Sequence, residues 1–381
     1  ITGGPGTGKT TIVKVLAELA RRLGETWAFA SPTGRAARRL TEACGEEGKT
    51  LHRLLEFGSR DAQFGRDEAN PLEASAVVVD EASMVDVYLY DALLSALPRG
   101  ARLVLVGDVD QLPSVGPGQV LRDLIESGVV PVARLTEVYR QAAESAIVRN
   151  AHRVLAGEVP VSAEREVGSR DCFVIDRDDA EELARTLVTV VTERLPRLGF
   201  DPRRDVQVLT PMHAGAVGTT ALNRRLGEAL NPEGEAITRG NKQFRVGDRV
   251  IQTKNDYDAD VFNGDVGTVR AVSPAGMTVD FEGREVAVSA DDLDRVELAW
   301  AISIHKSQGS EYPAVVVAMH TGHFVMLRRN LLYTALTRAR RLACLVVSPR
   351  ALRMAVTRTG VDDRHTGLAR RLRYGAGLAD A

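Results

Sequence analysis

Residues 3–10 read Gly-Gly-Pro-Gly-Thr-Gly-Lys-Thr, and they constrain the fold of this chain more than any other segment. The segment matches the pattern GxxxxGK[ST] at every fixed position. Glycines allow consecutive backbone N–H groups to turn inward around a phosphate, where side chains would clash. A helix is expected directly after such a loop, because its N-terminal dipole adds positive potential at the phosphate. The sequence therefore predicts a nucleotide-binding α/β domain at the start of the chain.

The residue types in this loop indicate which nucleotide contacts it makes. We expect Lys9 to reach the β- and γ-phosphates of ATP, and the hydroxyl of Thr10 to bind Mg²⁺. ATP and Mg²⁺ are therefore the predicted cofactors. The expected nucleotide-binding residues of the loop are Gly4, Pro5, Gly6, Thr7, Gly8, Lys9, Thr10 and Thr11.

Two further apolar segments end in polar residues that suit phosphoryl transfer. Residues 76–79 are Ala-Val-Val-Val, and Asp80 and Glu81 follow directly. We expect Asp80 to hold Mg²⁺, and Glu81 to orient and deprotonate an attacking water. Residues 102–107 lead to Gln111, whose amide is expected to sense the γ-phosphate. An ordinary loop glutamine is the alternative interpretation of Gln111.

Apolar and helical segments alternate in two separate parts of the chain. Strands are expected at 26–30, 76–80, 102–107, 206–210, 314–319 and 343–348, and helices at 11–23, 34–43, 183–194 and 219–230. Because the strands alternate with helices, the pattern predicts α/β domains with parallel sheets covered on both faces.

Residues 236–296 follow a different pattern, with short apolar–polar alternations broken by glycines. Closely spaced short strands with glycine turns predict a small antiparallel barrel inserted into the second α/β domain. The expected division is therefore a first domain at 1–132, a second domain at 133–235 and 297–381, and the barrel at 236–296. Residues 55–72 form either a surface loop or a protruding β-hairpin.

Two arginines beside small or polar residues are candidates for a role in catalysis. Arg140 lies in Tyr-Arg-Gln at 139–141, and Arg338 lies in the segment 333–340. A planar guanidinium can neutralise the charge that develops on a transferred phosphoryl group. Either arginine taken alone could instead form a surface ion pair.

Composition excludes several classes of protein. No apolar run reaches the roughly 20 residues that a membrane span needs. The three cysteines are widely spaced and form neither a disulfide framework nor a CxxC metal site, so we expect reduced thiols in a cytoplasmic protein. The 49 Lys and Arg nearly balance the 51 Asp and Glu, which argues against a wholly basic nucleic-acid-binding protein.

Taken together, the motifs resemble those of the superfamily 1 helicases, in the same order along the chain. Motifs I, Ia, II, III, IV, V and VI correspond to residues 3–10, 31–37, 80–84, 107–113, 139–141, 304–311 and 333–340. Segments 255–257, 261–267 and 305–311 are similar to those of the RecD-like group. The resemblance implies two RecA-like motor domains, a barrel of the Src-homology-3 type and a short pin hairpin. It also implies ATP-dependent 5′-to-3′ movement on single-stranded DNA and separation of duplex.

The resemblance assigns further roles to residues that match the motifs. Tyr139 would stack on adenine, and Glu311 would accept from the ribose or support motif V. The residues expected to line the DNA strand are Pro32, Thr33, Arg35, His52, His213, Asn263, His305, Lys306 and Ser307. Arginine clusters such as Arg35, Arg38 and Arg39 are either phosphate contacts or a solvated face. Because only 5% of residues are aromatic, backbone and phosphate contacts are expected to predominate over base stacking.

The implied partners are single-stranded DNA and its junctions with duplex, for a monomeric motor without a membrane contact. The family carries a strand and an adenine-reading glutamine motif before the P-loop, and we expect these in a longer protein. Two alternatives remain: a RecD-type motor subunit of a larger helicase–nuclease complex, and a P-loop ATPase that is not a motor. Stimulation of ATP turnover by single-stranded DNA would distinguish the last from the others.

Overall fold

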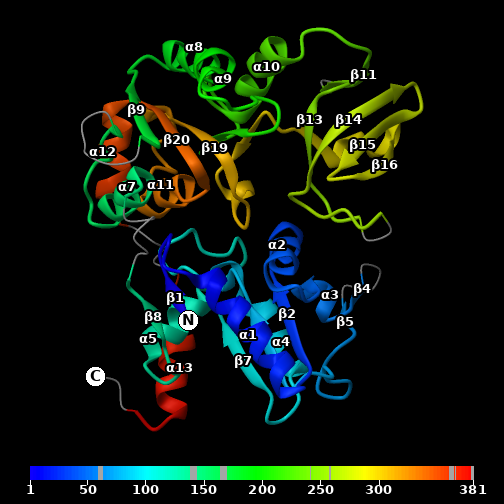
Figure 1. The fold of residues 1–381 in the computed structure, drawn as a ribbon, viewed down its shortest axis with the longest axis vertical. Coiled ribbons are helices and arrows are strands. Elements are labelled where there is room, and N and C mark those ends of the chain that lie inside the picture. Colours follow the sequence, from blue (N-terminus) through cyan, green and yellow to red (C-terminus); the bar gives the residue numbers. More distant parts are fainter. Residues whose placement is uncertain are drawn as a thin grey trace. The chain divides into compact units, whose positions relative to one another are not determined.

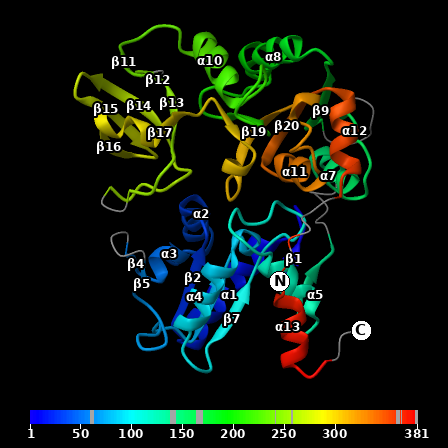
Figure 2. The same cartoon turned by 180° about the vertical axis from the view of Figure 1, so that it is seen from behind.

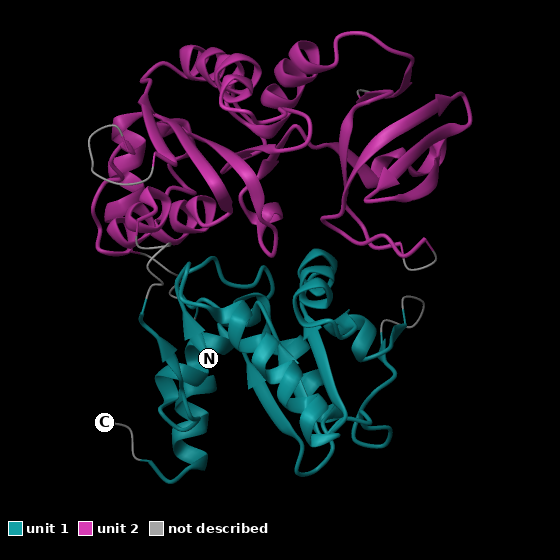
Figure 3. Cartoon of the chain, viewed as in Figure 1, with its two compact units in different colours: residues 1–143, 360–381 teal, residues 144–359 magenta. Residues whose placement is uncertain are grey.

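The computed structural model describes residues 1–58, 63–137, 144–163, 170–240, 242–256, 259–359, 364 and 366–378. The chain divides into two compact units, one of residues 1–143 with 360–381 and one of residues 144–359 (Figure 3). This division differs from the expected one, because residues 133–143 and 360–381 group with the first unit. The physical reason is pairing and packing: a strand after residue 132 and the last helix both join elements of that unit.

A parallel sheet forms the centre of the first unit (Figure 1). Its strand order is β3 (Gly48–Thr50), β2 (Trp27–Ser31), β6 (Ala76–Val79) and β7 (Arg102–Leu105). Beyond β7, Thr2 bridges Gly107, and β1 (Thr2–Gly3) pairs in parallel with β8 (Arg134–Leu135). The P-loop therefore begins at the end of β1, which lies next to the segment that follows β7.

β6 is buried on both sides because helices cover both faces of this sheet. Val77 and Val79 pack in a core with α3 (Leu51–Leu54), α4 (Val87–Ala96) and α5 (Val120–Ser127). Val78, which points the other way along the strand, packs with α1 (Lys9–Leu23) and α2 (Gly34–Cys44). The expected α/β layering of the first domain is confirmed.

A short hairpin lies within residues 55–72, the segment for which the sequence predicted either a surface loop or a β-hairpin. β4 (Phe57–Gly58) and β5 (Gln63–Phe64) pair antiparallel, and Phe57 lies opposite Phe64. Their rings are 5.1 Å apart and both contact the ring of His52. The hairpin alternative is therefore the one the structure adopts, with an aromatic cluster at its base.

The second unit contains another parallel sheet, with helices on both faces (Figures 1 and 2). The strand order is β18 (Ala301–Ser303), β10 (Val206–Thr210), β19 (Tyr312–Met319), β20 (Ala339–Val347) and β9 (Cys172–Asp176). One face packs with α8 (Ala180–Thr189) and α10 (Thr219–Leu230). The helices near the other face are α7 (Ala146–Leu155), α11 (Arg329–Leu336) and α12 (Pro349–Thr357). The expected helix at 183–194 ends in a π-helical turn, Val190–Arg194, followed by the short helix α9 (Leu195–Arg197).

An antiparallel β domain is inserted in this unit, as the sequence indicated. Its strand order is β16 (Arg284–Ser289), β15 (Gly276–Phe281), β14 (Val266–Ser273), β13 (Arg249–Gln252) and β17 (Val296–Leu298). A hairpin of β11 (Ala236–Arg239) and β12 (Lys242–Arg245) precedes it, and a 3-10 turn, Ala290–Arg295, precedes β17. Phe244, Val279 and Phe281 fill its core. Gly267 lies within β14 rather than in a turn, and a Cβ there would come 2.6 Å from Val279 Cγ1.

The three cysteines, Cys44, Cys172 and Cys344, are free thiols and all are buried. Among the described residues, no helix is both long enough and apolar enough to cross a membrane.

The C-terminal segment is held against the first unit by arginine side chains. Helix α13 (Leu368–Gly375) packs on α5. Arg364 donates to the carbonyl oxygens of Ser114, Gly116 and Gly118 at 2.8 to 2.9 Å. Arg373 donates to the carbonyl oxygens at the end of α5. The loop that follows motif III is thus clamped by a residue far along the chain.

We predict that Arg364→Ala loosens this loop without unfolding the unit. Three carbonyls would lose a charged donor, so the free energy of local opening should fall by about 2 kcal/mol. Hydrogen exchange should rise at residues 114–118. The matched control is Arg373→Ala, for which faster exchange is expected near residues 126–127 instead. An unchanged exchange rate at 114–118 in the Arg364 variant would show that the clamp contributes nothing.

Candidate functional site

The P-loop connects β1 to the first turn of α1 by two glycines in left-handed conformations. Gly6 and Gly8 have φ values of 72° and 89°, which side chains rarely adopt. Helix α1 begins at Lys9, so its N-terminal N–H groups follow the loop directly. Lys9 Nζ donates to the carbonyl oxygens of Gly3 and Gly4 at 2.7 and 2.9 Å. Thr7 is buried and supports the loop from inside, because its hydroxyl donates to the Gly4 carbonyl.

The predicted acid pair lies at the end of β6. Burial is the main cause that raises the pKa of Asp80 to about 6, and the neighbouring carboxylate of Glu81 adds to it. The backbone N–H of Glu81 donates to Asp80 Oδ1 at 2.9 Å and opposes this shift. Glu81 itself has φ 54°, which turns the chain sharply after the strand. The two carboxylates therefore have different surroundings although they are adjacent in sequence.

Arg39 pairs with the predicted catalytic base. Its Nη2 lies 3.5 Å from Glu81 Oε1, and the glutamate side chain is only 16% exposed. Arg39 lies on α2, which begins within motif Ia, and its charge also lowers the pKa of Asp80. The sequence analysis assigned the basic cluster that contains Arg39 either to phosphate contacts or to a solvated face. The structure instead brings it to the acidic pair.

The segment after β7 is organised by a buried aspartate. Asp108 accepts from the side-chain amide of Gln111 at 3.2 Å and from the backbone N–H of Asp110 at 3.1 Å. Gln111 is 9% exposed, so its amide is held in one orientation. Gly107 is constrained as well, because a Cβ there would come 2.8 Å from Leu121 Cδ2. The expected sensor thus belongs to a fixed loop rather than to a loose one.

The second unit carries Arg338 between α11 and β20. Arg338 is 2% exposed, and it donates to the carbonyl oxygen of Ser310 at 3.1 Å. Its own carbonyl accepts from the Tyr312 N–H, which ties motif VI to motif V. Glu311 faces Arg340 across 3.8 Å and lies at the surface. Tyr139 and Arg140 lie outside the described residues.

Several residues expected on the DNA strand have structural contacts here. The Thr33 hydroxyl caps α2 by accepting from the Ala36 N–H at 3.3 Å. His52 packs on the hairpin aromatics, and burial lowers its pKa. Ser307 is fully buried, and its hydroxyl donates to the Ile304 carbonyl at 2.7 Å. Its side chain therefore stabilises the turn and is not exposed at the protein surface. Pro32 and Arg35 are half-buried at the start of α2.

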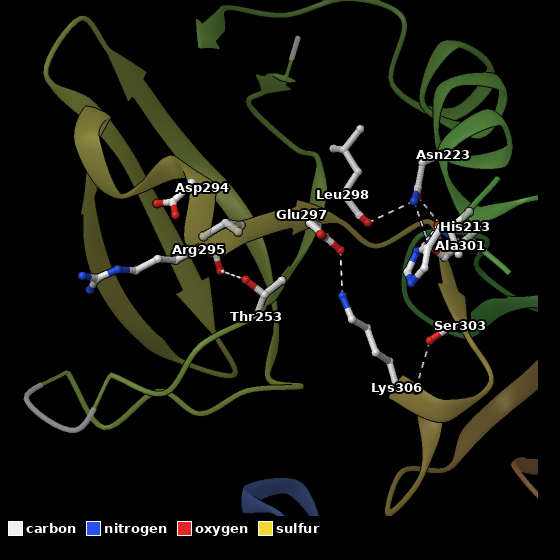
Figure 4. A network of polar contacts seen from close by, with 12 residues as sticks. His213, Asn223, Thr253, Asp294, Arg295, Glu297, Leu298, Ala301, Ser303 and Lys306 are labelled. Carbon is white, nitrogen blue, oxygen red and sulfur yellow. Dashed lines mark hydrogen bonds and ion pairs between the residues drawn. The ribbon is translucent and has the colours of Figure 1, made fainter. Parts of the chain in front are cut away.

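Two of the other expected strand residues of the second unit line one cavity of about 850 Å³. His213 and Lys306 line it, together with residues of α10, β12 and β17 (Figure 4). His213 Nδ1 lies 2.9 Å from the Thr219 hydroxyl. Burial, with a smaller effect of His213, lowers the pKa of His305. Asn263 lies apart on an exposed loop between β13 and β14.

Comparison with known families places these sites in context. Models of an AAA domain, a UvrD-like helicase C-terminal domain and an ATP-dependent RecD-like DNA helicase SH3 domain match residues 1–117, 298–346 and 222–281. A RecBCD enzyme subunit RecD from Mycobacterium tuberculosis is 37% identical, and the match covers 98% of this chain and 70% of that protein. The chain belongs to the RecD-like group of superfamily 1 helicases. An ATP-dependent RecD2 DNA helicase from Deinococcus radiodurans is 40% identical over 98% of this chain.

The RecD-like chain spans about half the length of that Deinococcus relative, 50% of it being covered. Among solved structures, Pif1 helicase from Bacteroides, in complex with ADP-AlF3 and single-stranded DNA, matches with a TM-score of 0.56 at 20% identity. The match covers 99% of this chain and 93% of that one. The fold is therefore that of two RecA-like domains with a small inserted barrel of the Src-homology-3 type, as the sequence predicted.

The sequence analysis missed Asp108, Glu297 and the pairing of Arg39 with Glu81. Asp108 is marked only by its place after a strand, Arg39 by its place one helical turn after Arg35, and Glu297 by nothing distinctive. Arg39 and Glu297 form ion pairs with Glu81 and Lys306, which lie in other elements. A single sequence gives no sign of such pairings.

The raised pKa of Asp80 predicts a pH-dependent stability in metal-free buffer. An acid whose pKa rises from 3.8 to about 6 on folding stabilises the folded state below about pH 4, and this stabilisation is lost as the pH passes 6. Asp80→Asn should therefore match the natural chain at pH 4. At pH 8 it should be more stable by up to about 3 kcal/mol, the equivalent of two pKa units.

Urea unfolding in the presence of a chelator, across this pH range, measures the difference. Asp91→Asn serves as the control, because Asp91 is an exposed acid on α4 in the same unit. A stability difference for Asp80→Asn that does not vary with pH would contradict the assignment of a desolvated carboxyl.

Proposed function

We propose that this chain is the motor of an ATP-dependent DNA helicase that moves 5′ to 3′ on single-stranded DNA and separates duplex. The observation that carries the proposal is the set of three residues in the first unit. Lys9 lies at the start of α1, directly after the P-loop, and Asp80 and Glu81 follow a fully buried strand. This set suits phosphoryl transfer, and membership of the RecD-like group supports ATP as the nucleotide.

The donor set fits Mg²⁺. The Asp80 carboxylate is desolvated and lies beside a second carboxylate, so a cation would favour its ionised form. The exposed hydroxyl of Thr10 supplies a second hard oxygen ligand. No cluster of three or more His, Cys, Asp or Glu side chains suited to a metal occurs among the described residues. Bound Mg²⁺ would neutralise charge on the phosphates, which is the chemistry such an ion supplies.

The remaining residues of the site take roles that follow from their chemistry. Glu81 accepts the proton of the attacking water, and Gln111 donates to the γ-phosphate or to that water. Lys9 neutralises the β- and γ-phosphate oxygens. Arg140 and Arg338 supply positive charge to the transferred phosphoryl group.

Single-stranded DNA and its junction with duplex are the proposed partners. Lys306 and His213 line the cavity in the second unit, where phosphate and sugar contacts fit the scarcity of aromatic residues. Arg35, His52 and His305 are the other basic candidates in this set, and Asn263 adds an exposed amide. The hairpin of β4 and β5 is the proposed pin. A monomeric motor and a cytoplasmic location stay predictions of the sequence.

We predict that two substitutions separate nucleotide binding from turnover. Lys9→Ala should lower DNA-stimulated ATP hydrolysis by about 100-fold or more, because the phosphates lose their main cation. Glu81→Gln should leave ATP binding intact and stop turnover to a similar degree, because the proton acceptor is lost. Steady-state ATPase rates with and without oligodeoxythymidylate, and equilibrium binding of a fluorescent ATP analogue, measure both effects.

Lys14→Ala is the matched control, because Lys14 is an exposed lysine on the same helix as Lys9. It should leave both measurements unchanged. Undiminished unwinding by the Lys9→Ala chain would refute the motor proposal, and a natural chain whose ATPase ignores DNA would favour a P-loop ATPase that is not a motor.

The direction of movement yields a second prediction. Duplexes with a 5′ single-stranded tail should be unwound at least about tenfold faster than those with a 3′ tail, because only one tail loads a motor of fixed polarity. A blunt duplex is the control substrate. A preference for the 3′ tail would overturn the proposed direction while leaving the ATPase assignment in place.

A motor subunit within a larger helicase–nuclease complex is the second candidate. The 37% identity to a RecBCD enzyme subunit RecD, over 70% of that protein, favours it specifically. Unwinding by the purified chain alone would favour an independent helicase. ATP hydrolysis without unwinding would favour the subunit.

A further inference from the structure

A salt bridge in the second unit neutralises a residue that the proposed function assigns to the DNA strand. Lys306 Nζ donates to Glu297 Oε2 at 2.7 Å (Figure 4). The two side chains are 25% and 45% exposed, so both remain accessible from the cavity that Lys306 and Glu297 line. A strand phosphate that approaches Lys306 therefore finds its ammonium group already paired with a carboxylate.

The backbone on both sides of this ion pair is fixed. Glu297 lies in β17, where it pairs with Ile251 of β13. The Lys306 N–H lies 3.3 Å from the Ser303 hydroxyl oxygen at the end of β18. Between them, the Asn223 side chain donates to the carbonyl oxygens of Leu298 and Ala301 and accepts from the Ala301 N–H. The spacing of the two charges is thus set by the fold and does not depend on a flexible loop.

The charges around Glu297 keep it ionised. Burial alone would raise its pKa, but the hydrogen bond and charge of Lys306, followed by Lys242 and His213, outweigh burial and lower the pKa. Lys242 is held separately, because its Nζ donates to the carbonyl oxygens of Asp294 and Val296 at 3.1 and 3.0 Å. Lys306 is therefore the cation that Glu297 holds directly by a hydrogen bond.

We propose that Glu297 acts as an intramolecular substitute for a strand phosphate, holding Lys306 until DNA displaces it and thereby weakening the grip of this unit on the strand. The inference rests on the proposed function, since it requires Lys306 to contact DNA. A carboxylate and a phosphodiester both offer an anionic oxygen to an ammonium group. Once the phosphate takes Lys306, the freed Glu297 carboxylate competes for the same ammonium group, so each contact is easier to release. A motor that steps along a strand needs contacts of this kind.

A different role for the same ion pair is a structural link between the barrel strand β17 and the α/β sheet. Exposed ion pairs contribute about 0–1 kcal/mol to stability, so such a link would be weak. The two roles predict different measurements. A link affects the melting temperature, whereas competition affects DNA affinity and its salt dependence.

The test uses the full chain and a fluorescent oligodeoxythymidylate in the absence of nucleotide. Glu297→Gln should bind it about three- to fivefold more tightly, the factor that an ion pair of this exposure can supply. The plot of log affinity against log salt, between about 50 and about 200 mM, should steepen by about 0.7. In the natural chain the freed carboxylate of Glu297 takes up a counterion while the strand releases one, and the variant lacks this compensation.

A double-mutant cycle shows whether Glu297 acts through Lys306. Lys306→Ala should weaken binding, and Glu297→Gln added to it should then change nothing. The charge-matched control is Asp294→Asn, because Asp294 is a nearby ion-paired carboxylate whose partner is Lys254, at 3.1 Å. This control should not tighten binding to the same degree.

Each outcome decides the matter. Equal tightening by Asp294→Asn, or tightening that persists in the Lys306→Ala background, would show a general charge effect and overturn the inference. A lower melting temperature with unchanged affinity would assign Glu297 the structural role. If the natural chain binds no single-stranded DNA, the proposed function itself fails; if it binds and Glu297→Gln matches it in affinity and salt slope, only the inference fails.

Discussion

The desolvated carboxylate of Asp80 is the constraint on which the rest of the first unit depends. Because β6 is buried on both faces, its end delivers this carboxylate to a place that water solvates poorly. An ionised acid there requires positive charge nearby, and Arg39 and Lys9 both act to lower its pKa. Arg39 and Lys9 lie on α2 and α1, which pack on the same face of the sheet. The packing of α1 and α2 thus decides which cations lie at the end of β6, where the proposed nucleotide site is.

Ion pairs hold functional groups in both units. Arg39 lies beside Glu81, and Glu297 lies beside Lys306. In each case one partner has a predicted role in the reaction or on the strand, and the other is a residue that the motifs assign no role. A charge held in this way keeps a defined position, and a ligand must compete for it. Such pairs therefore determine how readily a ligand binds at the site, as well as where the side chains of the site lie.

The structural features that could be predicted from the sequence are those that a local pattern of residues determines. The run Ala-Val-Val-Val before Asp80 indicated a buried strand that ends in an acid, and the glycines before Lys9 indicated the P-loop. Side-chain pairings between distant segments, such as Arg39 with Glu81, leave no periodicity or spacing to detect. The placement of α13 on α5 was missed for a related reason: an amphipathic helix shows which face it buries, but not against which core. The domain boundaries depend on which core such a helix packs against.

The near balance of charge now has a physical interpretation. With 49 basic and 51 acidic residues, many cations of this chain already have an anion nearby, as Lys306 and Lys254 do. Under the proposed function, DNA binding exchanges one anion for another, so the affinity would reflect a difference between two ion pairs rather than the full attraction of a free cation. A strongly basic surface would bind a strand more tightly and release it more slowly. For the proposed motor, which must let go of each phosphate, paired cations are therefore the more suitable arrangement.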